Sequence, residues 1–154
     1  MHQGKGTADI FANDDRVTTF DCFCNSNYPW KSRRTNTIDV PLADDTSDSA
    51  YLATLQSWLP KLAAVQPQLI FFQAGVDALS DDSLGNMRLS RTCLNARNNL
   101  VYSFALAQGV PLVVCMGGGY AKPDINPSVA AHADVYRTAA LRLSAAVGEL
   151  VQPY

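Results

Sequence analysis

The chain alternates between short apolar runs and longer segments in which apolar residues recur every three or four positions. The short runs predict β-strands, and the longer segments predict amphipathic helices. Strands are expected at 16–23, 69–74 and 110–116, and long helices at about 50–65, 90–108 and 127–147. A helical turn is expected around residues 10–11, and residues 25–41 are predicted to form a loop. This order of strands and helices is typical of an α/β protein.

The run at 110–116 is apolar without alternation, which predicts a strand buried on both faces in a parallel sheet with helices above and below. In such sheets, ligands and metals gather beyond the carboxyl ends of the strands. Asp77 follows the run at 69–74, so it is a candidate ligand. Its other interpretation is a turn-capping carboxylate.

Each predicted helix carries an apolar face. In the first the face is Leu52, Leu55, Trp58, Leu59 and Leu62, and Pro60 interrupts the helix. The second carries Leu94, Leu100, Val101, Phe104 and Ala105 inward, and the third has Val129, Ala133, Tyr136, Ala140, Leu143 and Val147 near one face. His132 in the third helix is expected to be structural or solvated rather than a ligand.

Composition excludes several functional classes. The 154 residues are 47% hydrophobic, which suits one domain or part of a larger one. A net charge of −2 provides no basic face for nucleic acid. No apolar run has the length of a membrane span, and the N-terminus has no apolar signal region, so a cytoplasmic location is expected.

The cysteines and the one basic cluster suggest no further chemistry. Cys22, Cys24, Cys93 and Cys115 lack the CxxC spacing of structural zinc sites, and we expect them to act as small apolar side chains. The basic cluster of Lys31, Arg33 and Arg34 is predicted to be solvated surface.

Three consecutive glycines, Gly117, Gly118 and Gly119, follow the last predicted strand. Glycines there allow the backbone to approach a ligand or a packed loop closely. The next residue, Tyr120, has a phenol that can donate a hydrogen bond to a developing oxyanion, as acyl transfer requires. A phosphate-binding loop in a nucleotide-binding module is an alternative, although neither GxxxxGK[ST] nor GxGxxG is present.

Three motifs together resemble the histone deacetylase superfamily. They are HQGKGTA at 2–8, AGVDALSDDSLG at 74–85 and GGGY at 117–120, in the order found in the bacterial and class IV-like branches of that superfamily. Asn27-Tyr28-Pro29 and residues 39–42 also match that branch. The resemblance covers nearly the whole chain.

The resemblance implies a three-layer, parallel-sheet, arginase-like α/β fold, represented here by its C-terminal half. It implies one catalytic zinc held by an Asp-x-His pair and a second aspartate, with His2 and Asp77 as the matching ligands. Tyr120 would polarise the substrate carbonyl, and Gly117 to Gly119 would form the substrate loop. The implied substrates are acetylated lysine or an acetylated small amine such as a polyamine, and a monovalent cation is a possible second ion.

The sequence also departs from the family pattern. The first aspartate of the Asp-x-His pair and the tandem histidines of the family do not occur in these 154 residues. Asp21 and Phe23 stand where relatives tend to carry serine and histidine, which affects the expected cation site. We therefore expect a truncated C-terminal part of a zinc-dependent deacetylase, inactive alone, that pairs with a missing N-terminal half or with itself. The alternative is a catalytically dead remnant that acts as a structural or self-associating domain.

Overall fold

A computed structural model describes residues 1–32 and 35–150. Arg33 and Arg34, two members of the predicted basic cluster, lie outside the described residues. Helices and strands follow one another along the chain as α1 (Lys5–Phe11), β1 (Phe20–Cys24), β2 (Ile38–Leu42), α2 (Asp48–Ala63), β3 (Ile70–Gln73), α3 (Arg91–Gln108), β4 (Leu112–Cys115) and α4 (Asn126–Leu150). This parallel α/β organisation confirms the predicted fold class.

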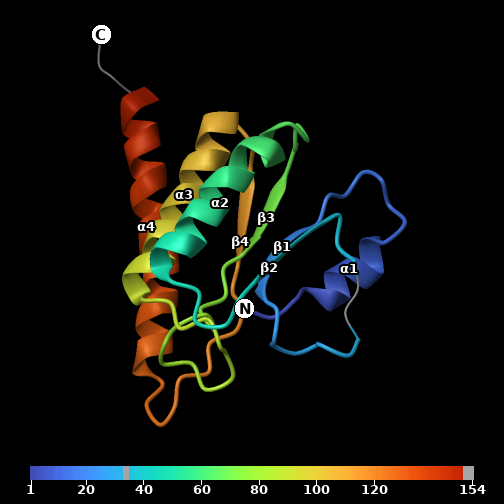
Figure 1. Ribbon diagram of the computed structural model, residues 1–154. Helices are drawn as coiled ribbons and strands as arrows, with labels where there is room; N and C mark the ends of the chain where they lie inside the picture. The colour runs from blue at the N-terminus through green and yellow to red at the C-terminus, as the bar shows by residue number, and fades with distance from the viewer. Residues whose placement is uncertain (33–34, 151–154) are drawn as a thin grey trace.

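The strands form two separate parallel pairs rather than one sheet. β1 pairs with β2 from Phe20↔Ile38 to Cys24↔Leu42, and β3 pairs with β4 from Ile70↔Leu112 to Gln73↔Cys115. Figure 1 shows helices α2, α3 and α4 gathered beside β3 and β4, with α1 and its loops on the far side of β1 and β2. The chain therefore has a helical side and a loop-rich side.

The core lies between α2, α3, α4 and the segments that follow β3. Its fully buried members include Val76, Leu79, Met87, Leu89, Leu94 and Val135. Phe72 of β3 meets Tyr102 of α3 edge to face, with 6.0 Å between ring centroids. This contact packs the β3–β4 pair against α3 and so positions the start of the loop after β3.

Local signals set the helix ends. The Ser47 side chain accepts a hydrogen bond from Ala50 N at the start of α2, and the Ser90 side chain does the same from Cys93 N at the start of α3. Gly109 ends α3 in the left-handed conformation, with φ of 63°. The two helix starts are joined, because the Asp48 carboxylate accepts a hydrogen bond of 2.9 Å from Ser90 N.

The prediction of a loop throughout 25–41 was wrong at its end, because β2 begins at Ile38. Pro41 obscured this strand, since proline normally demotes a strand assignment. The register explains why proline is tolerated: the backbone of Ile38, Val40 and Leu42 faces β1, so Pro41 lies with its nitrogen on the outer side of β2.

The prediction that the strand at 110–116 is buried on both faces was also wrong for this chain. Val113 is 41% exposed, and its neighbour Phe71 on β3 is 67% exposed. Helices cover only one face of the β3–β4 pair. The apolar run correctly indicated a strand, while the second covering layer is not supplied by the described residues.

The predicted apolar face of α4 is not the face that packs. Ser128, Ala131 and Val135 are buried, whereas Val129, Tyr136 and Leu143 are 57%, 42% and 62% exposed. Small side chains allow α4 to approach α3, and Tyr102 of α3 donates a 2.8 Å hydrogen bond to the Val135 carbonyl. The side chain of Val147 lies outside the described residues.

All four cysteines are free; Cys24 and Cys93 are buried, and Cys22 and Cys115 are half-buried. Among the described residues, no helix combines the length and apolar character needed to cross a membrane.

Candidate metal and substrate site

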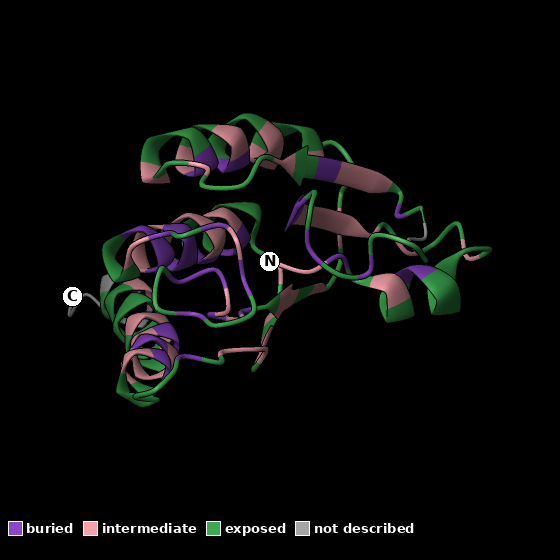
Figure 2. Cartoon of the chain, turned by 60° about the horizontal axis from the view of Figure 1, so that its bottom comes forward, coloured by how far each residue is buried: buried purple, intermediate pink, exposed green. Residues whose placement is uncertain are grey.

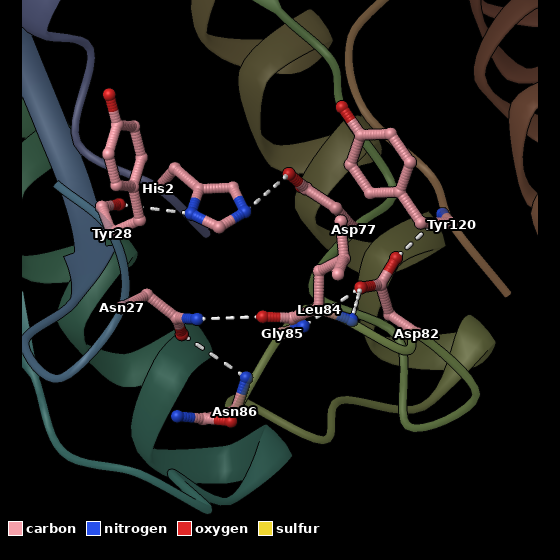
Figure 3. A network of polar contacts seen from close by, with 9 residues as sticks. All are labelled: His2, Asn27, Tyr28, Asp77, Asp82, Leu84, Gly85, Asn86 and Tyr120. Atoms are coloured by element: carbon pink, nitrogen blue, oxygen red, sulfur yellow. Dashed lines mark hydrogen bonds and ion pairs between the residues drawn. The ribbon is translucent and has the colours of Figure 1, made fainter.

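His2 lies where the N-terminal segment passes the end of β1. Its Nδ1 is 3.0 Å from the carbonyl oxygen of Tyr28, and its Nε2 is 3.9 Å from Asp77 Oδ2 (Figure 3). A ring nitrogen that donates to a carbonyl fixes the tautomer and leaves the other nitrogen with a lone pair. The geometry thus presents Nε2 as a potential metal donor on the side of Asp77.

Asp77 reaches the same point from the end of β3. The preceding loop is fixed by a 2.7 Å hydrogen bond from Val76 N to Gly118 O, and the Asp77 side chain is only 13% exposed. His2 and Asp77 are 75 residues apart in sequence, yet their side chains face each other. The structure therefore brings together the two predicted metal ligands.

The predicted glycine loop packs directly against the loop that carries Asp77. A Cβ added to Gly118 would lie 2.7 Å from Asp77 Oδ2 and 2.9 Å from Tyr120 Cε2. One added to Gly117 would lie 2.8 Å from Gly75 N. A Cβ at position 117 would collide with backbone, so close packing requires glycine there, whereas one at position 118 would force the side chains of Asp77 and Tyr120 to shift.

Tyr120 completes the group from the loop after β4. Its ring lies beside Asp77, and the exposed fraction of the residue is 43% (Figure 3). Its backbone is fastened at both ends, because Tyr120 N donates to Asp82 Oδ2 at 2.7 Å and Tyr120 O accepts from Ser83 Oγ at 2.7 Å. The ring is thus carried by an anchored backbone.

Asp82 is a positioning residue that the sequence interpretation treated only as part of a motif. It is 3% exposed, and its carboxylate accepts backbone hydrogen bonds from Leu84, Gly85 and Tyr120 at 2.8, 2.9 and 2.7 Å. Hydrogen bonds to a charged acceptor are the strong ones. Asp82 therefore joins the loop after β3 to the loop that carries Tyr120. The sequence feature that could have identified Asp82 is its position five residues after Asp77 in the AGxDxLxxDxLG motif.

Asn27 joins the same loop to the N-terminal side of the site. Its Nδ2 donates to Leu84 O at 2.8 Å, and its Oδ1 accepts from Asn86 N at 3.2 Å (Figure 3). Because Asn27 is buried and directly precedes Tyr28, these bonds also set the position of the carbonyl that binds His2.

A cavity of about 810 Å³ opens beside these residues. Its walls are formed by His2, Gln3, Gly4, Lys5, Gly6, Asn27, Tyr28, Pro29, Trp30, Leu84 and Tyr120. Tyr28 and Trp30 form an edge-to-face pair with centroids 6.1 Å apart. Apolar and aromatic walls with a few polar groups are typical of small-molecule sites.

Buried polar groups support the site from behind. Arg97 of α3 donates to Gly75 O at 2.7 Å and so fixes the loop that leads to Asp77. Burial raises the pKa of Asp21, whose carboxylate accepts a hydrogen bond from Gly4 N. Burial lowers the pKa of His132, while a hydrogen bond with the Gly118 backbone and the charge of Asp77 oppose this shift.

His2 and Asp77 are suitable zinc ligands, but they are only two. An imidazole nitrogen and a carboxylate oxygen are both zinc ligands. Within residues 1–32 and 35–150, however, no group of three or more histidine, cysteine, aspartate or glutamate side chains could hold a metal ion. His2 and Asp77 would therefore supply part of a coordination shell.

Comparison with known proteins gives a consistent family assignment. The model of the histone deacetylase domain family matches residues 1–136. An uncharacterized protein of Picosynechococcus is 40% identical over 140 residues, which are 90% of this chain and 46% of that protein. Histone deacetylase 2 of Arabidopsis thaliana is 33% identical over 124 residues, 79% of this chain and 32% of that enzyme. The chain thus spans less than half the length of these relatives.

Solved structures agree on the fold. The HDA15 HD domain superposes with a TM-score of 0.74 at 22% identity, and the match covers 90% of this chain and 41% of that domain. An HDAC homologue from Aquifex aeolicus gives 0.72 at 18% identity, covering 90% and 39%. An acetylpolyamine aminohydrolase from Burkholderia pseudomallei gives 0.69 at 18% identity, covering 90% and 42%.

Proposed function

Because this chain belongs to the histone deacetylase family, we propose that it contributes one part of a zinc-dependent deacetylase site that hydrolyses an acyl-amide. The observation that carries the proposal is the approach of His2 Nε2 to Asp77 Oδ2, 3.9 Å apart at the end of β3 and beside the apolar cavity. Acetylated lysine and acetylated small amines are the proposed substrates, in keeping with the named activities of relatives.

The proposed roles follow from the chemistry of each side chain. His2 and Asp77 would be two of the zinc ligands, and the Tyr28 carbonyl would hold His2 in the required tautomer. Zinc bound there would supply a Lewis acid and lower the pKa of a bound water. Tyr120 would donate a hydrogen bond to the acyl oxygen as negative charge develops on it. The glycine loop would let the backbone that leads to Tyr120 pack closely against the loop that carries Asp77.

We propose that the chain is inactive alone. Proton transfer by a positioned side chain typically contributes about a hundredfold or more in rate, and the family's tandem histidines do not occur in this sequence. The small donor set supports the same proposal. The missing groups would come from a polypeptide equivalent to the part of the deacetylase domain that this chain does not span. We also propose that the site binds a monovalent cation, on the basis of the resemblance to the family alone.

A second function is supported by the same small donor set. A catalytically dead domain that serves as a structural or self-associating unit would need the fold but not the metal. The exposed apolar residues Phe71 and Val113 favour such association.

Hydrolysis of an acetyl-lysine peptide tests the proposal. The assay compares the chain alone with the chain plus a complementing fragment, defined as the portion of the Picosynechococcus relative that precedes its region of similarity to this chain. We expect turnover only with the fragment, at least a hundredfold slower with Tyr120→Phe and abolished by Asp77→Ala. Absence of turnover in the mixed sample, despite complex formation, would favour the structural domain, and turnover by the lone chain would refute its inactivity.

A further inference from the structure

His132 lies on the packed side of α4, near the start of that helix. Its neighbours Ser128, one turn earlier, and Ala131 are each 2% exposed. Figure 2 shows the buried positions of α4 on the side that faces the rest of the chain. The chain enters α4 from the segment after β4 that carries Tyr120 (Figure 1). His132 is therefore placed behind the candidate site.

One ring nitrogen of His132 lies at the glycine loop. A Cβ added to Gly119 would lie 3.2 Å from His132 Nε2. The ring makes a hydrogen bond with the Gly118 backbone that raises the pKa of His132, so the ring is the donor and the Gly118 carbonyl is the acceptor. The other ring nitrogen, Nδ1, is buried and has no hydrogen-bond partner among the described residues. Nε2 is therefore the nitrogen that carries the proton and makes the bond.

The Gly118 carbonyl connects α4 to the loop that carries Asp77. It also accepts a 2.7 Å hydrogen bond from Val76 N, and a carbonyl oxygen has two lone pairs for the two donors. The same glycine packs against the Asp77 carboxylate, since a Cβ added to Gly118 would lie 2.7 Å from Asp77 Oδ2. A shift of the Gly118 peptide would therefore change the surface against which the Asp77 carboxylate lies.

Ser128 holds the chain on the other side of Tyr120. Ala121 N donates a hydrogen bond of 3.2 Å to Ser128 Oγ. Ser128 and His132 are four residues apart in α4, so their side chains project from the same face of the helix. These two side chains thus bind the backbone on either side of Tyr120, at Gly118 and at Ala121.

Packing alone does not explain a histidine at this position. A buried nitrogen without a partner destabilises the fold, and an apolar side chain would avoid that cost. The adjoining contacts of α4 are made by small or apolar side chains such as Ala131 and Val135. The imidazole is better explained by its hydrogen bond to Gly118.

We propose that His132 is a positioning residue of the candidate site. It donates from Nε2 to the Gly118 carbonyl and, together with Ser128, holds residues 118–121 so that the Asp77 carboxylate faces His2. The chemistry that is positioned in this way rests on the proposed function, whereas the hydrogen bond of His132 does not.

Nitrogen-15 NMR of the imidazole rings tests this bond in the unmodified chain. The sequence contains two histidines, so a spectrum of His2→Ala assigns the ring of His132. At about pH 8 that ring is neutral, because burial lowers its pKa below the ordinary 6.5. We expect the proton on Nε2 and a lone pair on Nδ1. A proton on Nδ1 would overturn the proposal, because Nε2 could then not donate to the Gly118 carbonyl.

His132→Gln and His132→Asn form a matched pair of variants. Both introduce an amide donor, but only the glutamine side chain is long enough to reach the position of Nε2. We expect hydrogen exchange at the N–H groups of Val76 and Tyr120 to be at least fivefold faster in His132→Asn than in His132→Gln, as for the loss of one hydrogen bond. The N–H of Leu94, which donates to Ser90 O at the start of α3, is the reference for global unfolding. If either variant unfolds, the ring spectra of the unmodified chain decide.

Zinc titration of the same two variants extends the test to Asp77. We expect His132→Asn to bind zinc about fivefold or more weakly than His132→Gln, although neither variant changes a proposed ligand. Equal exchange rates in the two variants would overturn the bond to Gly118. Equal zinc affinities, in a chain whose wild type binds zinc, would overturn the positioning role. A wild-type chain that binds no zinc would refute the proposed metal site, while the ring spectra and the exchange rates still decide whether His132 holds Gly118.

Discussion

Replacement of Asp82 by asparagine tests how the two loops of the site are held together. Asp82 is 3% exposed, and its two carboxylate oxygens accept three backbone hydrogen bonds. Leu84 N and Gly85 N share Oδ1, while Tyr120 N uses Oδ2. An asparagine has one acceptor oxygen, so whichever way its amide points, at least one backbone N–H faces an NH₂ group.

The size of the effect follows from this geometry. A hydrogen bond to a charged group contributes about 1.5–3 kcal/mol, and an unsatisfied buried donor costs about 1–3 kcal/mol. We therefore expect Asp82→Asn to lower the free energy of unfolding by about 2–4 kcal/mol. With a urea slope of about 2 kcal/mol/M, the midpoint should fall by about 1–2 M.

Urea unfolding followed by circular dichroism gives the measurement, and Asp81→Asn is the matched control. Asp81 is the adjacent residue, is exposed, and accepts only a 3.2 Å hydrogen bond from Ser80 Oγ. Surface substitutions of this kind usually change stability by less than about 0.5 kcal/mol. Equal midpoints for Asp82→Asn and Asp81→Asn would refute the anchoring role of Asp82.

Two further predictions concern packing and pH. Gly118→Ala should lower the free energy of unfolding by about 1–3 kcal/mol, because the added Cβ would lie 2.7 Å from Asp77 Oδ2. Gly6→Ala is the control and should not destabilise the fold, because no atom lies within 4 Å of its added Cβ. Calorimetric melting of both variants checks this prediction, and equal melting temperatures would contradict it. Burial raises the pKa of Asp21 in the folded chain above its ordinary value of 3.8, so the stability contributed by the protonated carboxyl is complete below pH 3.8 and is lost as pH rises through the folded pKa. The Asp21→Asn variant should therefore gain stability relative to the wild type as the pH is raised above 3.8 in urea titrations, and a pH-independent difference would contradict the shift.

The sequence was sufficient for the parts of the fold that depend on local patterns. Periodicity predicted α2, α3 and α4, alternation of apolar and polar residues predicted β1, and apolar runs predicted β3 and β4. It failed at β2, because the cost of a proline in a strand depends on which edge its nitrogen faces, and that is a property of the register. It also failed for the packed face of α4, where small side chains make the contact and large apolar ones are exposed.

The candidate site, like the fold, could be predicted from the sequence only in part. Motif resemblance singled out His2, Asp77 and Tyr120, and the structure brings all three to one region, although their roles stay predictions. The supporting groups were not predicted, because Asn27, Asp82 and Arg97 act through backbone atoms of distant loops. Such bonds depend on tertiary contacts that no local pattern specifies.

Zinc titration by isothermal calorimetry tests the central claim most directly. The chain, His2→Ala, Asp77→Ala and the double variant are compared, with Asp81→Asn as a control for lost acidic charge. If one ion is bound jointly, each single substitution should weaken zinc binding at least tenfold, and the double variant should lose little more than either single one. Zinc affinity that survives unchanged in His2→Ala and Asp77→Ala would contradict a shared metal site.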